Sequence, residues 1–341
     1  MRKEKIKLGI RSLIASLYYA ANRSLARLNG KTAILAYHRV VTEKELRNEF
    51  IQPGMYVRDD IFEMHLLFLK KHFQILSFRE LLDLWKENRQ ETGGRYCVIT
   101  LDDGWRDNYS YAFPLLRKHQ IPATIFLPTA LIDSNQRFWP DRLGALLRRS
   151  SRTDVPEEKK KALALLWSRY APARTLQGKN TEAGIDSAIE RFKELAEDER
   201  NGLIRNMTEI LGSEDNTERA LLTWDEIREM SRQGISFGSH SRTHKILTQH
   251  PLGVVREEIQ DSLQCLREQG IHHVPVFCYP NGNYNGEIAA QVRAAGYEAA
   301  VSTRFGLEAG PSEDRYGLKR IGIHNDISSS IPLFAYRMLG P

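Results

Sequence analysis

The most informative stretch of the sequence is Cys97-Val98-Ile99-Thr100-Leu101-Asp102-Asp103-Gly104-Trp105-Arg106-Asp107-Asn108-Tyr109. Its first residues are apolar and rich in β-branched side chains, which predicts a buried strand. The strand ends in two carboxylates and a glycine, and a glycine turn lets both acidic side chains enter one cavity. Neighbouring carboxylates repel each other, so each needs a reason to stay ionised, such as a metal ion or a proton-transfer role. Asp-Asp-Gly is also common in solvated turns, so this stretch alone leaves both interpretations open.

A second stretch favours the functional interpretation. Residues 235–239 predict another short strand, and His240-Ser241-Arg242-Thr243-His244 follows it. We expect the two histidines, four residues apart, to lie on one face of a helical turn and to present two imidazole nitrogens to one ion. In a parallel sheet all such strand ends gather on one face, where active sites are built. An aspartate and two histidines leave a coordination position for water, which is typical of a catalytic metal site.

The segments Thr100-Leu101-Asp102-Asp103-Gly104 and His240-Ser241-Arg242-Thr243-His244 resemble the first two motifs of the polysaccharide deacetylase family. That family includes chitin and peptidoglycan deacetylases and the nodulation-type chitooligosaccharide deacetylases. The resemblance extends, with one large interruption, from about residue 33 to about residue 325, and the two motifs occur in the family's order. It implies a metal-dependent hydrolase that removes N-acetyl groups from the amino sugars of a polysaccharide or a lipid-linked glycan.

The resemblance also implies roles for individual residues. Asp102 corresponds to the general base, and Asp103, His240 and His244 correspond to the ligands of a divalent metal ion, which we expect to be zinc. Such an ion lowers the pKa of a bound water, the nucleophile, and polarises the acetyl carbonyl. His324, at the end of the last predicted strand, matches the position of the family's histidine acid, which protonates the departing amine. A structural histidine remains the alternative for His324.

The sequence departs from the family pattern at Cys278-Tyr279-Pro280-Asn281. Many members carry Arg-x-Pro-Tyr here, with the arginine holding the base and the tyrosine's backbone N–H serving the oxyanion. Asn281 preserves a backbone N–H at the second position, whereas Cys278 cannot replace the arginine. Arg320 or Arg106 could supply a guanidinium from another strand end. Tyr279 is a further candidate for the substrate and oxyanion site.

His38 lies near the end of a predicted strand at 32–40, and a Tyr-His pair at this point is similar to the opening strand of many family members. We expect His38 to line the same strand-end face, with a structural histidine as the alternative.

The order of apolar segments and helical periods predicts an α/β fold. Together with the family resemblance, it indicates a distorted (β/α) barrel of about seven parallel strands over residues 31–330. The predicted strands, in chain order, are 32–40, 97–101, 121–127, 235–239, 274–278, 299–302 and 318–324. Residues 141–220 carry charged, helical patterns without a strand signal and predict an insertion. This insertion either covers the substrate groove or is purely structural.

Residues 1–30 predict a basic amphipathic helix. The segment opens with the basic residues Arg2, Lys3, Lys5 and Lys7. Its apolar residues recur at helical spacing: Ile10, Leu13, Ile14, Leu17, Tyr18, Ala21 and Leu25. A helix of this kind lies on an anionic membrane surface, and the apolar run is too short for a span of about 20 residues. A signal peptide and a helix packed on the domain are the alternatives, and Ser24-Leu25-Ala26 before Arg27 is a poor cleavage site.

Composition narrows the classes of partner and compartment. The net charge of +6 admits an anionic partner, but the basic residues alternate with acids along helices and form no basic stripe with aromatics. We therefore expect no nucleic acid partner. Three cysteines without paired spacing predict no disulfide framework and favour a reducing compartment. We expect a cytoplasmic protein or one associated with the cytoplasmic side of a membrane, with an exported protein as the alternative.

The sequence leaves two alternative functions open besides the deacetylase. A catalytically silent carbohydrate-binding member of the same fold is suggested by the missing motif arginine. A glycosyltransferase with a nucleotide-sugar metal on Asp102 and Asp103 is the third, and it leaves the histidine pair unexplained.

Overall fold

The computed structural model describes residues 2–21, 25–48, 50–170, 182–212, 219–311 and 314–339. Residues 22–24 of the predicted N-terminal segment, with Ser24 of the weak cleavage site, lie outside the described residues, as do 171–181 and 213–218 of the predicted insertion. The chain divides into two compact units. The first comprises Met1–Val41, Tyr56–Ser134 and Ala220–Pro341, and the second comprises Thr42–Met55 and Asn135–Arg219.

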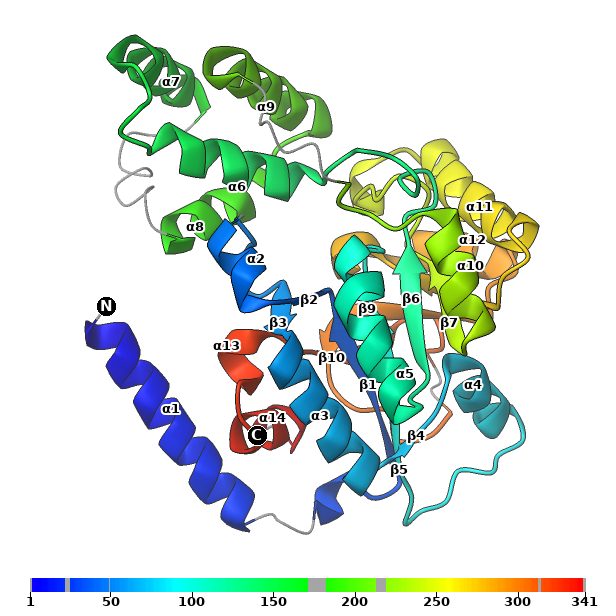
Figure 1. The fold of residues 1–341 in the computed structure, drawn as a ribbon. Helices are drawn as coiled ribbons and strands as arrows, with labels where there is room; N and C mark the ends of the chain where they lie inside the picture. Colours follow the sequence, from blue (N-terminus) through cyan, green and yellow to red (C-terminus); the bar gives the residue numbers. More distant parts are fainter. Residues whose placement is uncertain are drawn as a thin grey trace. The chain divides into compact units, whose positions relative to one another are not determined.

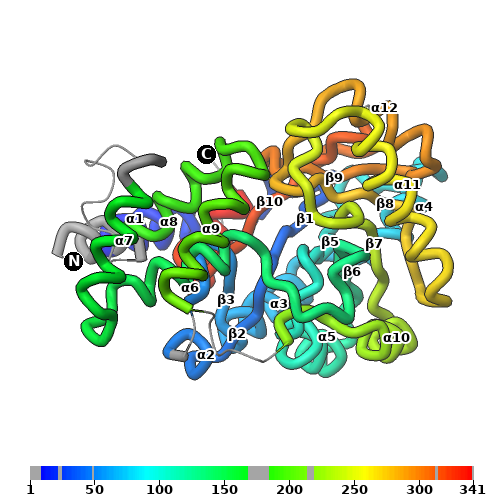
Figure 2. The backbone as a smooth tube through the Cα atoms, turned by 90° about the horizontal axis from the view of Figure 1, so that it is seen from above, coloured from blue at the N-terminus to red at the C-terminus, as the bar shows by residue number. Residues whose placement is uncertain are grey.

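Within the described residues, the first unit is built on a closed barrel of seven parallel strands (Figures 1 and 2). The order around the barrel is β1-β10-β9-β8-β7-β6-β5, and β5 pairs with β1 to close it, from Lys31 opposite Arg95 to Tyr37 opposite Leu101. The barrel strands are β1 (Lys31–Tyr37), β5 (Arg95–Leu101), β6 (Ala123–Leu127), β7 (Ile235–Ser239), β8 (His273–Cys278), β9 (Ala299–Phe305) and β10 (Leu318–Gly322). The predicted fold class is confirmed.

Helices and short strands surround this barrel. The helices of the first unit are α1 (Arg2–Ala21), α3 (Asp59–His72), α4 (Phe78–Lys86), α5 (Phe113–His119), α10 (Trp224–Arg232), α11 (Leu252–Glu268), α12 (Gly286–Ala294), α13 (Asn325–Ser328) and α14 (Ile331–Leu339). A short strand β4 (Gln74–Ile75) extends the sheet beside β5. Helices α4 and α10 begin with capping boxes at Ser77 and Thr223. In each, the cap hydroxyl accepts from the backbone N–H of the glutamate three positions later, and that glutamate's carboxylate accepts from the cap's backbone N–H.

One predicted strand is broken in the structure. The segment predicted as a single strand at 32–40 is interrupted at His38, and β2 (Arg39–Val41) pairs instead with β3 (Tyr56–Arg58) in a separate two-stranded sheet. The physical reason is Asp107, whose carboxylate accepts hydrogen bonds from the backbone N–H of Val40 at 3.1 Å and from Nε of Arg39 at 2.6 Å. The prediction missed the break because Asp107 is distant in sequence.

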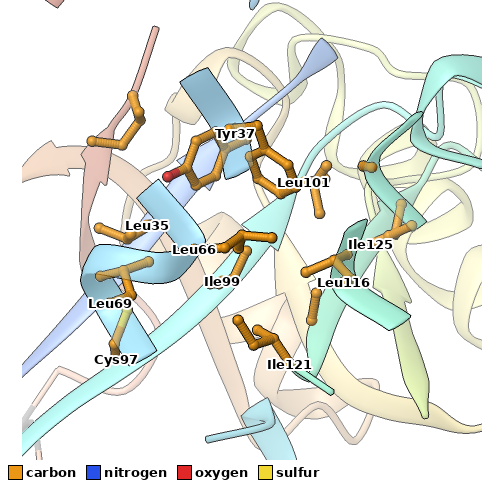
Figure 3. Packing of buried hydrophobic residues seen from close by; sticks show 14 of the residues in the cluster. Leu35, Tyr37, Leu66, Leu69, Cys97, Ile99, Leu101, Leu116, Ile121 and Ile125 are labelled. Atoms are coloured by element: carbon orange, nitrogen blue, oxygen red, sulfur yellow. The ribbon is translucent and has the colours of Figure 1, made fainter. Parts of the chain in front are cut away.

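The barrel strands alternate between two cores. In β5, Cys97, Ile99 and Leu101 face outward into the packing with helices, and Figure 3 shows Leu66 of α3 and Leu116 of α5 in this layer. The intervening residues belong to a second cluster that contains inward-facing side chains of the barrel: Ile34, Val98, Phe126, Val276, Cys278, Val301 and Leu318. This period of two places the residue after Leu101 on the inward side of the barrel at the carboxyl ends of the strands.

The second unit has a core of its own. It contains α2 (Glu43–Asn48), α6 (Trp139–Ser150), α7 (Glu157–Tyr170), α8 (Glu182–Phe192) and α9 (Glu197–Leu211). Residues 42–55 also belong to this unit, which the sequence analysis did not anticipate. Two contacts attach them: the ring of Phe50 packs on Gly144, and the Gln52 amide donates to Asp186 at 2.8 Å. The predicted covering of a substrate groove by 141–220 stays a prediction.

Candidate active site

Asp103, His240 and His244 converge at the carboxyl ends of β5 and β7. Nε2 of His240 lies 3.3 Å and Nε2 of His244 lies 3.2 Å from Oδ1 of Asp103. One potential ligand atom from each residue falls within 4.8 Å of the others. Asp103 and His240 are buried, and His244 is about one quarter exposed, so the group opens to solvent on one side.

The backbone of the histidine motif differs from the prediction. Residues 240–244 form a loop, not a helical turn, and both Ser241 and His244 have positive φ angles, of 63° and 61°. The carboxylate of Glu258 on α11 holds this loop, accepting from the backbone N–H groups of Arg242 and Thr243 at 2.9 and 2.7 Å. The loop nevertheless brings both imidazoles to one carboxylate oxygen. The helical turn predicted from the four-residue spacing of the histidines is wrong because Glu258, a partner distant in sequence, sets the conformation of this loop.

The donors of this cluster fit a divalent metal ion. Nδ1 of His240 lies 2.8 Å from the backbone oxygen of Cys278, so this nitrogen carries the proton and leaves Nε2 with its lone pair. The indole N–H of Trp105 donates to Oδ2 of Asp103 at 3.0 Å, which leaves Oδ1 facing the histidines. Ligand atoms about 2.0–2.1 Å from a tetrahedral zinc ion are about 3.3 Å apart, close to the observed separations.

Asp102 has a different set of partners. Both of its oxygens accept hydrogen bonds from the guanidinium of Arg320, each at 2.8 Å, and Sγ of Cys278 lies 3.6 Å from Oδ2. Nε2 of His38 lies 3.8 Å from the same oxygen. Burial alone would raise the pKa of Asp102, but the charge and hydrogen bonds of Arg320 outweigh it and hold this pKa below its usual value. Asp102 is therefore ionised at neutral pH.

The turn after β5 separates the two aspartates. Asp102 continues the inward alternation of the strand, whereas Asp103 has φ of 75° and Gly104 has φ of 65°. These two left-handed residues turn the chain away from the strand, and aspartate tolerates this region better than most residues. A Cβ on Gly104 would lie 2.9 Å from Cδ2 of Leu127. The turn predicted from Asp-Asp-Gly therefore gives each carboxylate its own environment.

Arg320 holds Asp102, the contact that the family resemblance gives to the absent motif arginine. Of the two candidates from the sequence, Arg320 is buried against Asp102, whereas the side chain of Arg106 is exposed. Nη2 of Arg320 also donates to Sγ of Cys278 at 3.2 Å. Leu318 and Cys278 face inward on β10 and β8, and Arg320 has the same parity as Leu318. Cys278, which stands at the motif arginine's position in the sequence, is thus a small side chain next to the guanidinium of Arg320 on β10.

The remaining predicted residues follow other strands. His324 lies two residues beyond the end of β10, and its Nδ1 lies 3.7 Å from a carboxylate oxygen of Asp326. Tyr279 is buried, and its hydroxyl donates to the backbone oxygen of Tyr316 at 2.9 Å. Asn281 is exposed in the turn after β8, with φ of 57°. Burial lowers the pKa of His38, which lies beside Asp102. No structural observation assigns these four residues a catalytic role, and their roles stay predictions.

Sequence reasoning missed two supporting residues, Trp105 and Glu258. Trp105 was inside the quoted stretch, but nothing in its position signals that the indole reaches back to Asp103. The guanidinium of Arg39 lies over the Trp105 ring, 4.5 Å from its centroid, and is paired with Asp107. Glu258 is a buried acid in a helix that the sequence shows as amphipathic, and a buried glutamate signals a partner only once its burial is known.

The geometry can now be compared with known proteins. The family model for polysaccharide deacetylase matches residues 89–164 and 172–300, a span that contains Asp102, Asp103, His240 and His244 but neither Arg320 nor His324. A Bacillus subtilis (strain 168) protein named "Putative polysaccharide deacetylase YxkH" is 22% identical over 302 residues, covering 88% of this chain and 74% of that protein. The poly-beta-1,6-N-acetyl-D-glucosamine N-deacetylase of Staphylococcus epidermidis is 33% identical over 122 residues, 33% of this chain and 41% of that protein.

A solved structure shares the fold. The Streptococcus pyogenes deacetylase PplD, in complex with acetate, superposes with a TM-score of 0.58 at 20% identity, covering 91% of this chain and 99% of that one. The family model, the parallel barrel and the paired carboxylate and histidine motifs agree. The chain belongs to the polysaccharide deacetylase family and is a hydrolase of carbon–nitrogen bonds other than peptide bonds.

Proposed function

We propose that this protein is a metal-dependent N-deacetylase that acts on the amino sugars of a polysaccharide or a lipid-linked glycan. The observation that carries the proposal is the pairing of two sites: the three converging donors of Asp103, His240 and His244, and the separately held carboxylate of Asp102. A divalent cation on the three donors, zinc by the composition of the ligand set, would supply Lewis acidity for water activation and carbonyl polarisation.

Asp102 acts as the general base in this proposal. Its ionised carboxylate accepts the proton that the attacking water loses, and Arg320 keeps it in a fixed orientation through two hydrogen bonds. A cation bound at the three donors would neutralise the carboxylate of Asp103. The carboxylate of Asp102 stays free for proton transfer. The two aspartates therefore have separate tasks, in agreement with their separate partners.

His324 protonates the departing amine in this proposal, and the backbone N–H of Asn281 serves the oxyanion. Support for His324 comes from its place after β10, at the end of the barrel where His38, Asp102 and His240 follow β1, β5 and β7. The carboxylate of Asp326 lies 3.7 Å from Nδ1 of His324. An acid that follows β10 and a base that follows β5 together satisfy the proton balance of amide hydrolysis.

The acetylated amino sugar is favoured as substrate by the family and by the relative that is named for poly-β-1,6-N-acetylglucosamine. We propose N-acetylated glucosamine residues within an oligosaccharide as the group on which the enzyme acts. Nothing specific favours an O-acetyl substrate, which lacks the amine that a histidine acid would protonate.

Acetate release from defined oligosaccharides tests the proposal. β-1,4- and β-1,6-linked N-acetylglucosamine oligomers are incubated with the protein as purified, with the chelated protein, and with chelated protein given zinc. The proposal expects release that the chelator abolishes and zinc restores, and that Asp103→Asn and His244→Gln both lose. Stoichiometric zinc binding with no release from either oligomer, together with oligosaccharide binding, would instead favour the catalytically silent carbohydrate-binding protein.

A further inference from the structure

Helix α1 carries apolar side chains on two opposite sides, and only one side is used by the fold. Ala15 is fully buried, Tyr18 packs edge-on against Tyr336 of α14 at 5.2 Å between ring centroids, and Tyr19 lies against Phe68 of α3 at 6.4 Å. Figure 1 shows α1 near α14 in the first unit, and the contacts above define that packed face. The packed residues occupy one sector of the helix, because successive residues are 100° apart.

The other side of α1 is apolar and exposed. Its residues recur at the i, i+3, i+4 and i+7 positions of one helix face: Ile10 (54% exposed), Leu13 (61%), Ile14 (49%) and Leu17 (65%). Among the described residues they form four of the nine large hydrophobic side chains with high exposure, and they are adjacent on one helix. Tyr18 and Leu25, which the sequence grouped with this stripe, belong to the packing of the domain instead.

The net charge of the chain comes from the sequence segment that contains this face. Residues 1–27 contain seven lysines and arginines and one glutamate, a net charge of +6, while residues 28–341 contain 42 basic and 42 acidic residues. The whole net charge of the protein therefore lies in the segment that includes α1. Positive charge next to an exposed apolar stripe is the pattern of a helix that lies in the interface of an anionic bilayer.

We propose that the exposed face of α1, formed by Ile10, Leu13, Ile14 and Leu17, docks on the surface of an anionic lipid bilayer. A second copy of this chain is a poorer occupant, because two segments 1–27, each of charge +6, would repel each other when face to face. The inference concerns α1 alone and does not depend on the proposed function. In the described part of the chain, no helix has the length and the apolar content to cross a bilayer.

Co-sedimentation of the full chain with vesicles tests this proposal. One vesicle set contains phosphatidylcholine and phosphatidylglycerol at about 3:1, and the other contains phosphatidylcholine alone. We expect binding to the anionic vesicles only, weakened at least several-fold when NaCl rises from about 0.1 to about 0.5 M, because salt screens the attraction.

The variant pair Leu13→Gln/Leu17→Gln removes the centre of the face without touching Ala15, Tyr18 or Tyr19. We expect it to lose about tenfold in vesicle affinity, by analogy with the area and charge dependence of interfacial helices. The matched control Leu67→Gln/Leu252→Gln removes two exposed leucines from α3 and α11 and should bind as the wild type. Thermal unfolding checks that both variants fold.

Two results would overturn the proposal. The first is equal binding of the wild type and Leu13→Gln/Leu17→Gln to anionic vesicles, or no binding of the wild type. The second is a dimer in light scattering that Leu13→Gln/Leu17→Gln converts to a monomer, which would assign the face to a second copy. Because no deacetylation is measured, failure here leaves the proposed function untouched.

Discussion

The guanidinium of Arg320 on β10 donates to both carboxylate oxygens of Asp102, after β5, at 2.8 Å each. Both side chains are almost fully buried, and Arg320 also donates to the backbone oxygen of Ser302 at 3.0 Å. A buried bidentate pair of this kind fixes geometry as well as charge, because the planar guanidinium matches the carboxylate. Asp102 is thereby held ionised and in one orientation next to the cluster of Asp103, His240 and His244.

The first prediction concerns this pair. Arg320→Met should lower kcat by at least about 100-fold with a smaller effect on zinc affinity, because an unpaired buried carboxylate is misoriented and costly. Without the guanidinium the pKa of Asp102 rises, so the acid limb of the pH–rate profile should move to higher pH. The pH profile of kcat is the measurement.

Arg106→Met is the control for this prediction, since Arg106 is the other arginine candidate near the same strand end and its side chain is exposed. It should keep the wild-type pH profile. An unshifted acid limb in Arg320→Met would contradict the assignment of Asp102 as the base held by Arg320.

The second prediction concerns Trp105. Trp105→Phe removes the N–H that donates to Oδ2 of Asp103 and leaves a ring of similar shape under Arg39. Loss of such an outer hydrogen bond to a metal ligand typically weakens metal affinity about 10- to 100-fold. Competition with a chromophoric zinc chelator measures the change.

Trp85→Phe provides the comparison, because the Trp85 indole donates to Gln90 at 2.7 Å near α4, a contact that involves none of the metal-binding candidates. It should bind zinc as the wild type does. Equal zinc affinity in Trp105→Phe would mean that Oδ1 of Asp103 needs no outer support.

The third prediction separates acid catalysis from metal binding. His324→Gln should lower kcat about 100-fold or more on an N-acetyl substrate, since general acid catalysis contributes about 100- to 10,000-fold, while zinc affinity stays within about twofold. Asp326→Asn should have a smaller effect on kcat in the same direction, because it changes only the neighbour of Nδ1.

A substrate whose leaving group needs no proton checks the role. An N-acetyl or O-acetyl substrate with a good leaving group should be hydrolysed by His324→Gln at closer to the wild-type rate. Equal losses on both substrates would assign His324 to structure and not to proton donation.

The fourth prediction concerns the buried histidine His65 of α3. Its Nε2 lies 2.7 Å from the backbone oxygen of Ser328, and its ring stacks on Phe334 at 3.9 Å between centroids. Burial lowers the pKa of His65 to about 4. The unfolded chain has a histidine pKa near 6.5, so it binds more protons than the folded state between these values.

The free energy of unfolding should therefore fall as pH drops from about 6.5 to about 4, by at most about 3 kcal/mol from this residue. Urea unfolding over this range should show a shallower pH dependence in His65→Gln than in the wild type, whatever the variant's absolute stability. His272→Gln, an exposed histidine, should keep the wild-type slope. Parallel slopes for His65→Gln and wild type would contradict the prediction.

The sequence contained the fold class because each barrel strand carries a local signal. Runs such as 97–101 and 235–239 are short, apolar and bounded by turn residues, and helices with capping boxes at Ser77 and Thr223 separate some of them. Local propensity and the handedness of parallel connections then leave few topologies. The break at His38 escaped because the competing partner, Asp107, acts across 67 positions in the chain.

The candidate site residues were partly predictable from local sequence as well. The doublet Asp102-Asp103 and the pair His240 and His244 are recognisable within five residues each, because metal ligands of one strand end lie close together in sequence. Their supports are not. Trp105, Glu258 and Arg320 act through buried hydrogen bonds, and a buried polar side chain in a sequence is indistinguishable from an exposed one until the fold pairs it.

What the sequence by itself determined is therefore the parallel barrel, the identity of the metal-binding candidates and the absence of the motif arginine at Cys278. Only the tertiary structure decided that Arg320 reaches Asp102 from β10, that His240 and His244 lie in a loop and not a helix, and which side of α1 remains exposed. The reason is physical: strand and turn signals act over a few residues, whereas ion pairing, burial and helix packing depend on neighbours that only chain closure brings together.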